Sequence, residues 1–302
     1  MNKRNVKQVV LPLLTALIWG SAFVAQTIGA ESIDGFTYSA ARSYPAVISL
    51  FVVLLVMRRA KPQEKYTAER KKELLVGGVV CGIFLTFSTN IQQFALTETG
   101  AGKAGFITAL YIVLVPLFGV FLGKKASRRL ILCVAIAVAG LYLLSIKSGE
   151  GLGGMGRGDF LVLCSAFGFA GHILVVDHYV QKVDGVALSC VQFVVMAIIS
   201  TICALLFETV DLNAIAACSG SILYVGVLSS AVGYTLQIIA QKDGDPTVVS
   251  LLLSLESFFA VVCGALILHE RMSVREYLGC ALMLTAVLLS QLPEKKRAAQ
   301  EE

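Results

Sequence analysis

The chain has 302 residues, of which 57% are hydrophobic and 15% are charged, and its formal net charge is +5. Most charged residues lie in short segments between long apolar stretches, so the positive charge does not require a nucleic-acid partner. The apolar stretches take up so much of the chain that they leave no separate soluble domain.

Ten stretches of 16 to 23 mostly apolar residues follow one another along the chain. About 20 residues at 1.5 Å per residue cross the roughly 30 Å hydrocarbon layer of a bilayer, so each stretch has about the length of a membrane span. The expected spans are residues 9–30, 36–57, 74–96, 104–123, 130–146, 160–179, 186–207, 219–241, 247–268 and 277–292.

A membrane span is a helix or part of a closed barrel, because lipid offers no partner to free backbone groups. The ten stretches lack the alternation of apolar and polar residues that is typical of barrel strands. The sequence therefore predicts an all-α integral membrane protein with ten transmembrane helices. The fifth and tenth stretches, with 17 and 16 residues, are the shortest, which indicates tilted helices or a thin bilayer.

The distribution of Lys and Arg predicts the topology. The first stretch follows three cations, as in a signal peptide, but its 22 apolar residues end without a cleavage motif, so we expect a retained span. A cytoplasmic N-terminus places 19 Lys and Arg residues on the cytoplasmic side and five on the other. Because cytoplasmic loops carry the excess of these residues, we expect a multi-pass protein of the cell (plasma) membrane with both termini cytoplasmic.

Neither the cysteines nor the glycines predict a metal or cofactor site. The eight cysteines form no CxxC pair and lie mostly in apolar stretches, so packing is the expected role and no metal is predicted. The Gly-rich segment 149–157 contains a GxGxxG string, but no strand precedes it. We interpret it as a linker and expect no nucleotide or other cofactor.

The two halves of the chain resemble each other. A shift of 146 residues aligns 125–129 with 271–275, so the fifth span repeats as the tenth, and a shift of 150 aligns the first span with the sixth. Each repeat has five spans, and an odd number places the second copy in the opposite orientation. The expected organisation is a five-helix repeat at 1–148, a Gly-rich loop at 149–157, an inverted five-helix repeat at 158–293 and a cytoplasmic tail at 294–302.

Short strings at the repeat ends resemble a known family. They are LIWGSAF at 17–23, Gly158-Asp159, LESFFA at 255–260 and LHERMS at 268–273. In this order and spacing they resemble the EamA-type branch of the drug/metabolite transporter (DMT) superfamily, over nearly the whole chain. The resemblance implies ten helices in two inverted repeats. It also implies transport of small polar metabolites, often amino acids and often outward, through a cavity lined by helices one to four and six to nine.

Two positions depart from the family pattern. Ser257 stands where the family usually has a proline after the glutamate of the ninth span, so a kink there is not predicted. The first repeat has Lys124-Lys125 where the second has Glu270-Arg271, so the two helix ends cannot make symmetric ion pairs.

Polar residues recur at intervals of four and three residues in three spans, which places each set on one helix face. The sets are Thr86, Asn90 and Gln93, then Ser230, Tyr234 and Gln237, then Ser250, Ser254 and Ser257. Such faces line a cavity or bond helices to one another, and both interpretations stay open. The substrate-binding candidates on and aligned with these faces are Asn90, Gln93, Tyr111, Tyr234, Gln237 and Ser254.

Ionisable groups at membrane depth are costly and tend to have a partner or a function. Glu256, near the middle of the ninth span, is the candidate to carry a proton or bind an amine. Arg42 could bind a substrate carboxylate through two parallel hydrogen bonds or reach the outer surface. His172 is a second candidate for proton coupling, or a packing residue. Trp19 is expected in the cavity wall or in packing.

These features predict a secondary active transporter that exports a small polar metabolite by alternating access. The expected solute is amino-acid-like, or another zwitterionic or neutral compound. Proton coupling is the testable mechanism. An uptake carrier for a cationic or a nucleoside- or vitamin-like solute is the alternative, followed by a lipid scramblase or an intramembrane enzyme. An enzyme is not expected, because the spans lack paired carboxylates and a Ser-His pair. The expected partners are a small-molecule substrate and the lipid bilayer. Two small-residue pairs, Gly78/Gly82 and Gly119/Gly123, suit either packing within the chain or a homodimer.

Overall fold

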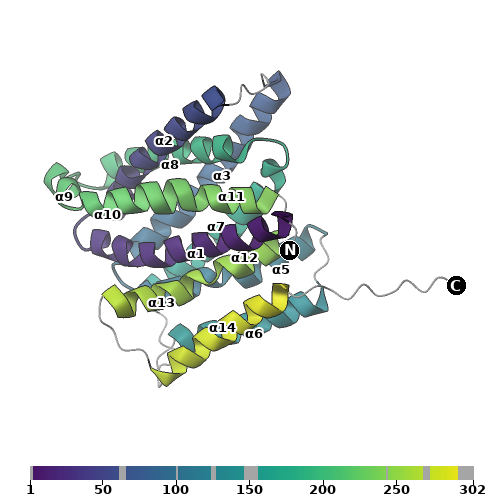
Figure 1. Ribbon diagram of the computed structural model, residues 1–302. Coiled ribbons are helices and arrows are strands. Elements are labelled where there is room, and N and C mark those ends of the chain that lie inside the picture. The colour runs from purple at the N-terminus through teal and green to yellow at the C-terminus, as the bar shows by residue number, and fades with distance from the viewer. Residues whose placement is uncertain are drawn as a thin grey trace.

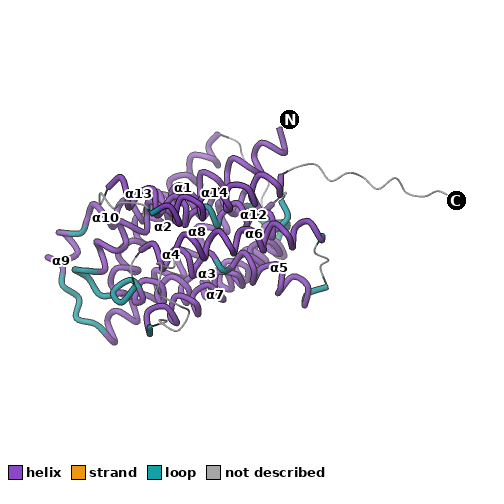
Figure 2. Tube along the Cα trace, turned by 90° about the horizontal axis from the view of Figure 1, so that it is seen from below, coloured by secondary structure: helices purple, strands orange, loops and turns teal. Residues whose placement is uncertain are grey.

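The computed structural model describes residues 3–60, 66–99, 101–123, 127–145, 156–242, 244–267 and 273–291. Within these ranges the regular structure is helical throughout, and the helices form one bundle (Figures 1 and 2). Several segments named above lie outside the described residues. They are residues 151–155 of the GxGxxG string, residues 124–125 and 270–271, and the tail from 294.

The helices of the first half are α1 (Lys3–Ala30), α2 (Gly35–Ala60), α3 (Ala68–Ala95), α4 (Ala101–Ala109), α5 (Tyr111–Phe121) and α6 (Arg128–Ser145). The second half contains α7 (Arg157–Val180), α8 (Gly185–Phe207), α9 (Leu212–Ala217), α10 (Ser219–Leu223), the π-helix η2 (Tyr224–Gly233), α11 (Tyr234–Lys242), α12 (Pro246–Leu253), α13 (Glu256–Ile267) and α14 (Val274–Gln291).

Eight helical segments among the described residues are long and apolar enough to cross a bilayer, judged by length and composition. They coincide with eight of the ten predicted spans. The fifth and tenth spans form α6 and α14, which have 18 residues each and fall outside this set of eight. Large apolar side chains such as Ile48, Ile83 and Leu205 are more than half exposed on the outside of the bundle, as lipid-facing residues are. The chain is therefore an all-helical membrane protein with about ten principal helices.

Local sequence signals begin several helices. The Thr67 hydroxyl accepts the N–H of Arg70 at the start of α3, and Asp184 accepts the N–H of Ala187 at the start of α8. Asp245 precedes Pro246 and caps α12 in the same way. The first turn of α2 is capped from outside: the Glu208 carboxylate, just after α8, accepts both backbone N–H groups that follow Gly35.

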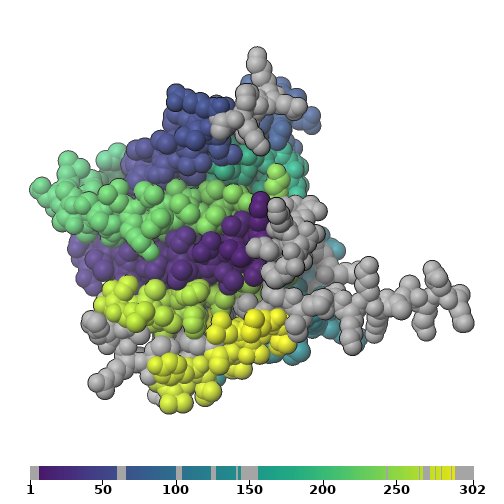
Figure 3. All heavy atoms as spheres, viewed as in Figure 1, coloured from purple at the N-terminus to yellow at the C-terminus, as the bar shows by residue number. Residues whose placement is uncertain are grey.

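Helices of the first half pack mainly against helices of the second. The most extensive contacts join α6 to α14, α3 to α7, α2 to α8, α3 to α8 and α1 to α13. Figure 3 shows α1 in purple between the green of α10 to α11 and the yellow-green of α13. Gly78 and Gly82 of α3 lie against Val191 and Val195 of α8, so this glycine pair packs within the chain. The two halves are thus interleaved.

The fourth and ninth predicted spans are each interrupted near the middle. Leu110 separates α4 from α5, and Ser254 and Leu255 separate α12 from α13. At both places backbone N–H groups bond three residues back, from Leu110 to Ile107 and from Leu255 to Leu252. The ninth span is therefore broken although Ser257 replaces the usual proline.

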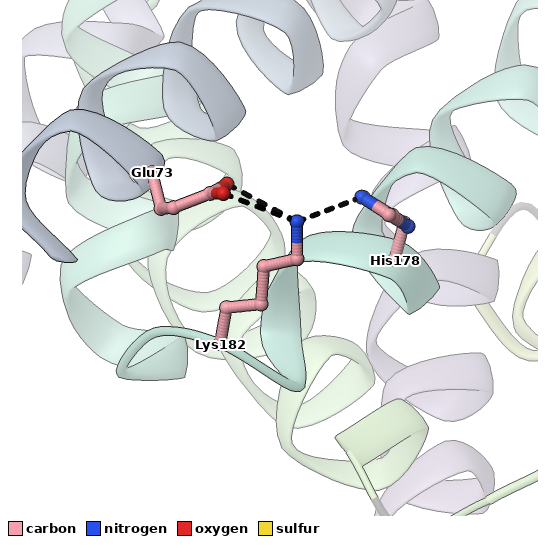
Figure 4. A network of polar contacts seen from close by, with 3 residues as sticks. All are labelled: Glu73, His178 and Lys182. Atoms are coloured by element: carbon pink, nitrogen blue, oxygen red, sulfur yellow. Dashed lines mark hydrogen bonds and ion pairs between the residues drawn. The ribbon is translucent and has the colours of Figure 1, made fainter. Parts of the chain in front are cut away.

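The start of α1 and the end of α14 lie at the same end of the bundle (Figure 1). A polar network joins the start of α3 to the end of α7: the Lys182 ammonium lies 3.2 Å from Glu73 and donates to His178 Nε2 at 3.0 Å (Figure 4). Because Glu73 and Lys182 are each about one-third exposed, this ion pair contributes at most about 1 kcal/mol.

Candidate functional site

A small cavity, with about 40 Å³ open to the centre of a water-sized sphere, lies between the two halves of the bundle. Helices α1 to α5 line it from the first half, and α7, η2, α11 and α13 line it from the second. The lining residues are Trp19, Phe23, Gln26, Arg42, Thr89, Gln92, Thr108, Tyr111, Phe169, His172, Ile173, Ser229, Tyr234, Gln237 and Glu256.

The structure brings seven of the ten candidate residues together around this cavity and places three elsewhere. Those that line it are Trp19, Arg42, Tyr111, His172, Tyr234, Gln237 and Glu256. Those outside the lining are Asn90, Gln93 and Ser254, all of which are buried.

The Asn90 face of α3 bonds neighbouring helices. Asn90 Nδ2 donates to Ser200 Oγ of α8 at 3.0 Å, and Gln93 Nε2 donates to the Gln26 carbonyl of α1 at 3.2 Å. The cavity is lined by the adjacent face, one residue earlier, with Thr89 and Gln92. Because α3 is buried between α7 and α8, it carries polar residues on both faces.

The hydroxyl groups of the serines in α12 and directly after it donate hydrogen bonds to backbone carbonyl groups. Ser254 Oγ donates to the Leu251 carbonyl at 2.7 Å, and Ser250 does the same to Thr247 at 2.8 Å. Ser257 Oγ donates to the Gly105 carbonyl of α4 at 2.7 Å, which ties the two interrupted helices together.

The π-helix η2 changes which serine faces the cavity. In a π-helix the neighbour along one face is five residues away, so Ser229 and not Ser230 shares the face of Tyr234. Ser229 is the residue that lines the cavity. Its carbonyl accepts the Trp19 indole N–H at 3.1 Å, and the Trp19 and Tyr234 rings lie 4.7 Å apart. Together they form one aromatic wall.

Arg42 is buried, with 4% of its surface exposed. Its Nη1 donates to Gln26 Oε1 at 2.9 Å, and its guanidinium lies 5.9 Å from the centre of the Tyr38 ring. Nε and Nη2 have no hydrogen-bond partner. Arg42 therefore does not reach the outer surface, and it retains two donors that could bind a carboxylate.

Glu256 is the first residue of α13 and is 3% exposed. The Tyr111 hydroxyl is close enough to interact electrostatically with this carboxyl group, but Tyr111 Oη and Glu256 Oε1 each lack a hydrogen-bond partner of good geometry. Gly20 of α1 faces the Glu256 backbone, where a methyl group would lie 2.6 Å from the Glu256 carbonyl oxygen. Only glycine permits α1 to approach this closely.

His172 is held by a residue outside the cavity lining. Its Nε2 lies 2.9 Å from Gln192 Oε1 of α8, and its ring meets Tyr234 edge-on at 5.8 Å. If Nε2–H donates to Gln192, then Nδ1 is left as an acceptor.

Unpartnered polar atoms concentrate at the cavity. Buried side-chain atoms without a hydrogen-bond partner include Nε and Nη2 of Arg42, Oη of Tyr111, Oε1 of Gln237 and Oε1 of Glu256. A buried polar atom without a partner costs about 1–3 kcal/mol, so a polar solute or water at this place is favoured.

Sequence reasoning missed eight lining residues. They are Phe23, Gln26, Thr89, Gln92, Thr108, Phe169, Ile173 and Ser229. Gln26 and Phe23 follow Trp19 at helical spacing, a signal that could have found them. Gln92 Nε2 donates to Thr108 Oγ1 at 2.8 Å, a contact between helices that periodicity does not reveal. No cluster of His, Cys, Asp and Glu suited to a metal occurs among the described residues.

The EamA-like transporter family matches the chain twice, over residues 6–146 and 156–292. The chain therefore belongs to the EamA-like transporter family, as its motifs predicted, and is a membrane transporter of the DMT superfamily. Members of this family are generally not enzymes. The double match is consistent with a duplicated repeat.

The chain is similar to other transporters along nearly its whole length. An uncharacterized transporter of Archaeoglobus fulgidus is 28% identical over 280 residues, which cover 92% of this chain and 84% of that relative. The transporter YwfM of Bacillus subtilis is 25% identical over 294 residues, 95% of each chain. A solved crystal structure has the same fold, with a TM-score of 0.76, 16% identity, and coverage of 94% of this chain and 96% of that one.

Proposed function

We propose that the protein is a secondary active transporter of the plasma membrane that exports a small zwitterionic or neutral polar metabolite by alternating access. The observation that carries this proposal is the central cavity, which both halves line and in which a buried basic group and a buried acidic group have no ion-pair partner among the described residues. Arg42 offers unpartnered donors and Glu256 an unpartnered acceptor. A buried charge without a partner is costly, so a solute that supplies the counter-charges is favoured.

Three observations support two inverted five-helix repeats. The contacts between helices occur in pairs that exchanging the two halves would relate. The contact of α3 with α7 corresponds to that of α1 with η2 and α11. The contact of α1 with α13 corresponds to that of α7 with α4 and α5. The interruptions fall at equivalent places in the fourth and ninth spans. The start of α1 and the end of α14 lie at one end of the bundle, as an even number of crossings requires. We place both ends in the cytoplasm because the loops on the same side of the membrane carry the excess of Lys and Arg.

Bending within helices suits alternating access in this fold. Because the halves are interleaved, moving them apart as two intact bodies would break the contacts between α2 and α8 and between α3 and α7. The interruptions before Tyr111 and Glu256 provide points where each span can bend next to the cavity. Discontinuous helices at the binding site are common in secondary transporters.

Glu256 is the proposed proton site. It is the acidic residue among those that line the cavity, and it lies at an interruption, where a change of charge can alter how the half-helices pack. A proton and a substrate amine would compete for this carboxylate. Their competition couples export of the substrate to entry of a proton.

The test is pH-gradient-driven transport in proteoliposomes by the unaltered protein, Glu256→Gln and Glu98→Gln. Glu98 is a matched control because it lies at the bundle surface, paired with Arg157 at 3.6 Å. We expect Glu256→Gln to exchange solute down its own gradient but not to respond to the pH gradient, while Glu98→Gln behaves as the unaltered protein. A pH response retained in Glu256→Gln would exclude Glu256 as the proton site.

A further inference from the structure

We propose that the cavity selects an extended zwitterion, in which an apolar spacer separates the cationic nitrogen from the carboxylate, over an α-amino acid. This inference rests on the proposed transport function and specifies the chemistry of its substrate.

Contacts with α1 place the Glu256 backbone and the Arg42 guanidinium at different levels of the cavity. The Glu256 backbone lies against Gly20, whereas the Arg42 guanidinium is bonded to Gln26. These two positions of α1 are six residues apart, which is about 9 Å along the helix axis. In an α-amino acid the ammonium and the carboxylate are attached to the same carbon, so their separation is much smaller than this.

Apolar and aromatic groups occupy the interval between the charges. Phe23 lies midway between Gly20 and Gln26 on α1 and lines the cavity, next to the wall formed by Trp19 and Tyr234. Tyr234 interacts electrostatically with both Arg42 and Glu256, although these two form no ion pair. The cavity thus has a cation-binding end at Glu256, an apolar middle at Phe23 and an anion-binding end at Arg42.

No second pair of charges offers an α-amino acid a compact site. Among the described lining residues, Glu256 is the one acidic group, and Arg42 is the one basic group apart from His172. Gln26 Oε1 already accepts a hydrogen bond from Arg42 Nη1, so an ammonium beside the guanidinium would share this oxygen with Arg42. An α-amino acid bound at Arg42 would leave Glu256 without a counter-charge.

A pair of structural isomers tests this directly. Norleucine and ε-aminocaproate have the same atoms and the same net charge and differ in the separation of their charges. Binding is measured on the purified full chain by calorimetry and by ligand-induced thermal stabilisation. We expect ε-aminocaproate to bind at least tenfold more tightly than norleucine. Equal or tighter binding of norleucine would overturn the inference and leave the transport function intact.

Single-charge ligands locate the two ends. Hexylamine should lose about ten- to hundredfold in affinity in Glu256→Gln and little in Arg42→Gln, and hexanoate should show the reverse. Arg157→Gln, at an arginine that is 81% exposed, is the control for loss of a guanidinium.

If both ligands depend on the same residue, the two-ended site is wrong. If vesicles move a neutral polar solute and the protein binds no zwitterion, the inference alone fails. If they move no solute at all, the proposed function fails with it.

Discussion

Tyr111 and Glu256 are the first residues of α5 and α13, and each follows the interruption of its helix. One comes from each half, and their side chains interact across the cavity while the Tyr111 hydroxyl and one carboxylate oxygen of Glu256 have no hydrogen-bond partner. The two interruptions therefore bring a phenol from one half and a carboxyl group from the other to one place.

Tyr111→Phe should weaken solute binding without destabilising the protein. Its hydroxyl is buried and unpartnered, so its removal breaks no hydrogen bond within the chain. We expect an unchanged or slightly raised Tm in detergent and a loss of transport activity in vesicles. A clear drop in Tm together with full transport would show that this hydroxyl is structural.

Tyr38→Phe is the matched substitution outside the cavity lining. The Tyr38 hydroxyl is bonded to Ser221 Oγ at 2.6 Å, and the Tyr38 side chain is fully buried. Loss of this hydrogen bond should cost about 1 kcal/mol of stability and lower the Tm. Solute affinity should stay near that of the unaltered protein, so the two tyrosines should show opposite patterns.

Gly20→Ala should destabilise the contact between α1 and α13. The added methyl group would lie 2.6 Å from the Glu256 carbonyl oxygen and 2.8 Å from the Ala260 backbone nitrogen, both of which are main-chain atoms. We expect a cost of about 1–3 kcal/mol and impaired transport, because Glu256 is displaced. Thermal unfolding and vesicle transport measure the two effects.

Gly105→Ala is the control for this glycine. Its methyl group would meet ordinary contacts of 3.7 Å, at Ala260 and Phe23. Alanine is favoured over glycine in a helix by up to about 1 kcal/mol, so this variant should be as stable as the unaltered protein or more so. If both alanine variants lose stability alike, close approach at Gly20 is not the cause.

Apolar length was sufficient to predict the bundle, because a bilayer imposes one span length on every helix. It could not predict that α3 is polar on two faces. Asn90 and Thr89 are adjacent in sequence and both contact α8, but Thr89 also lines the cavity and Asn90 does not. Periodicity identifies a polar face but not what that face meets.

Two features of the site depend on backbone geometry that no pattern signalled. The ten-residue π-helix η2 shifts the cavity face from Ser230 to Ser229. The interruption before Glu256 occurs without a proline, through backbone bonds that span three residues and serines bonded to carbonyls. Glu256 itself was predictable, because a carboxyl group in the middle of an apolar span is rare enough to indicate a function.

Glu208→Ala should loosen the start of α2. The Glu208 carboxylate accepts the backbone N–H groups of Phe36 and Thr37 at 2.8 and 2.7 Å, and both would lose their partner. Loss of such a cap costs about 0.5–2 kcal/mol. The Tm should fall, whereas Glu31→Ala, at an exposed acidic residue just before α2, should leave it unchanged. Equal Tm values for the two variants would refute the capping role.

Cysteine accessibility in whole cells should report the inversion of the two repeats. Glu31 follows α1 and Lys182 follows α7, so they lie in corresponding turns of the two halves, and both are exposed. In a background without native cysteines, a membrane-impermeant maleimide should label Glu31→Cys in intact cells. It should label Lys182→Cys and Lys7→Cys only after the membrane is permeabilised, because these two are cytoplasmic in the topology that we propose from the Lys and Arg excess. Labelling of Glu31→Cys and Lys182→Cys from the same side would mean that the repeats are parallel, and a fold of that kind could not alternate around a shared cavity as proposed here.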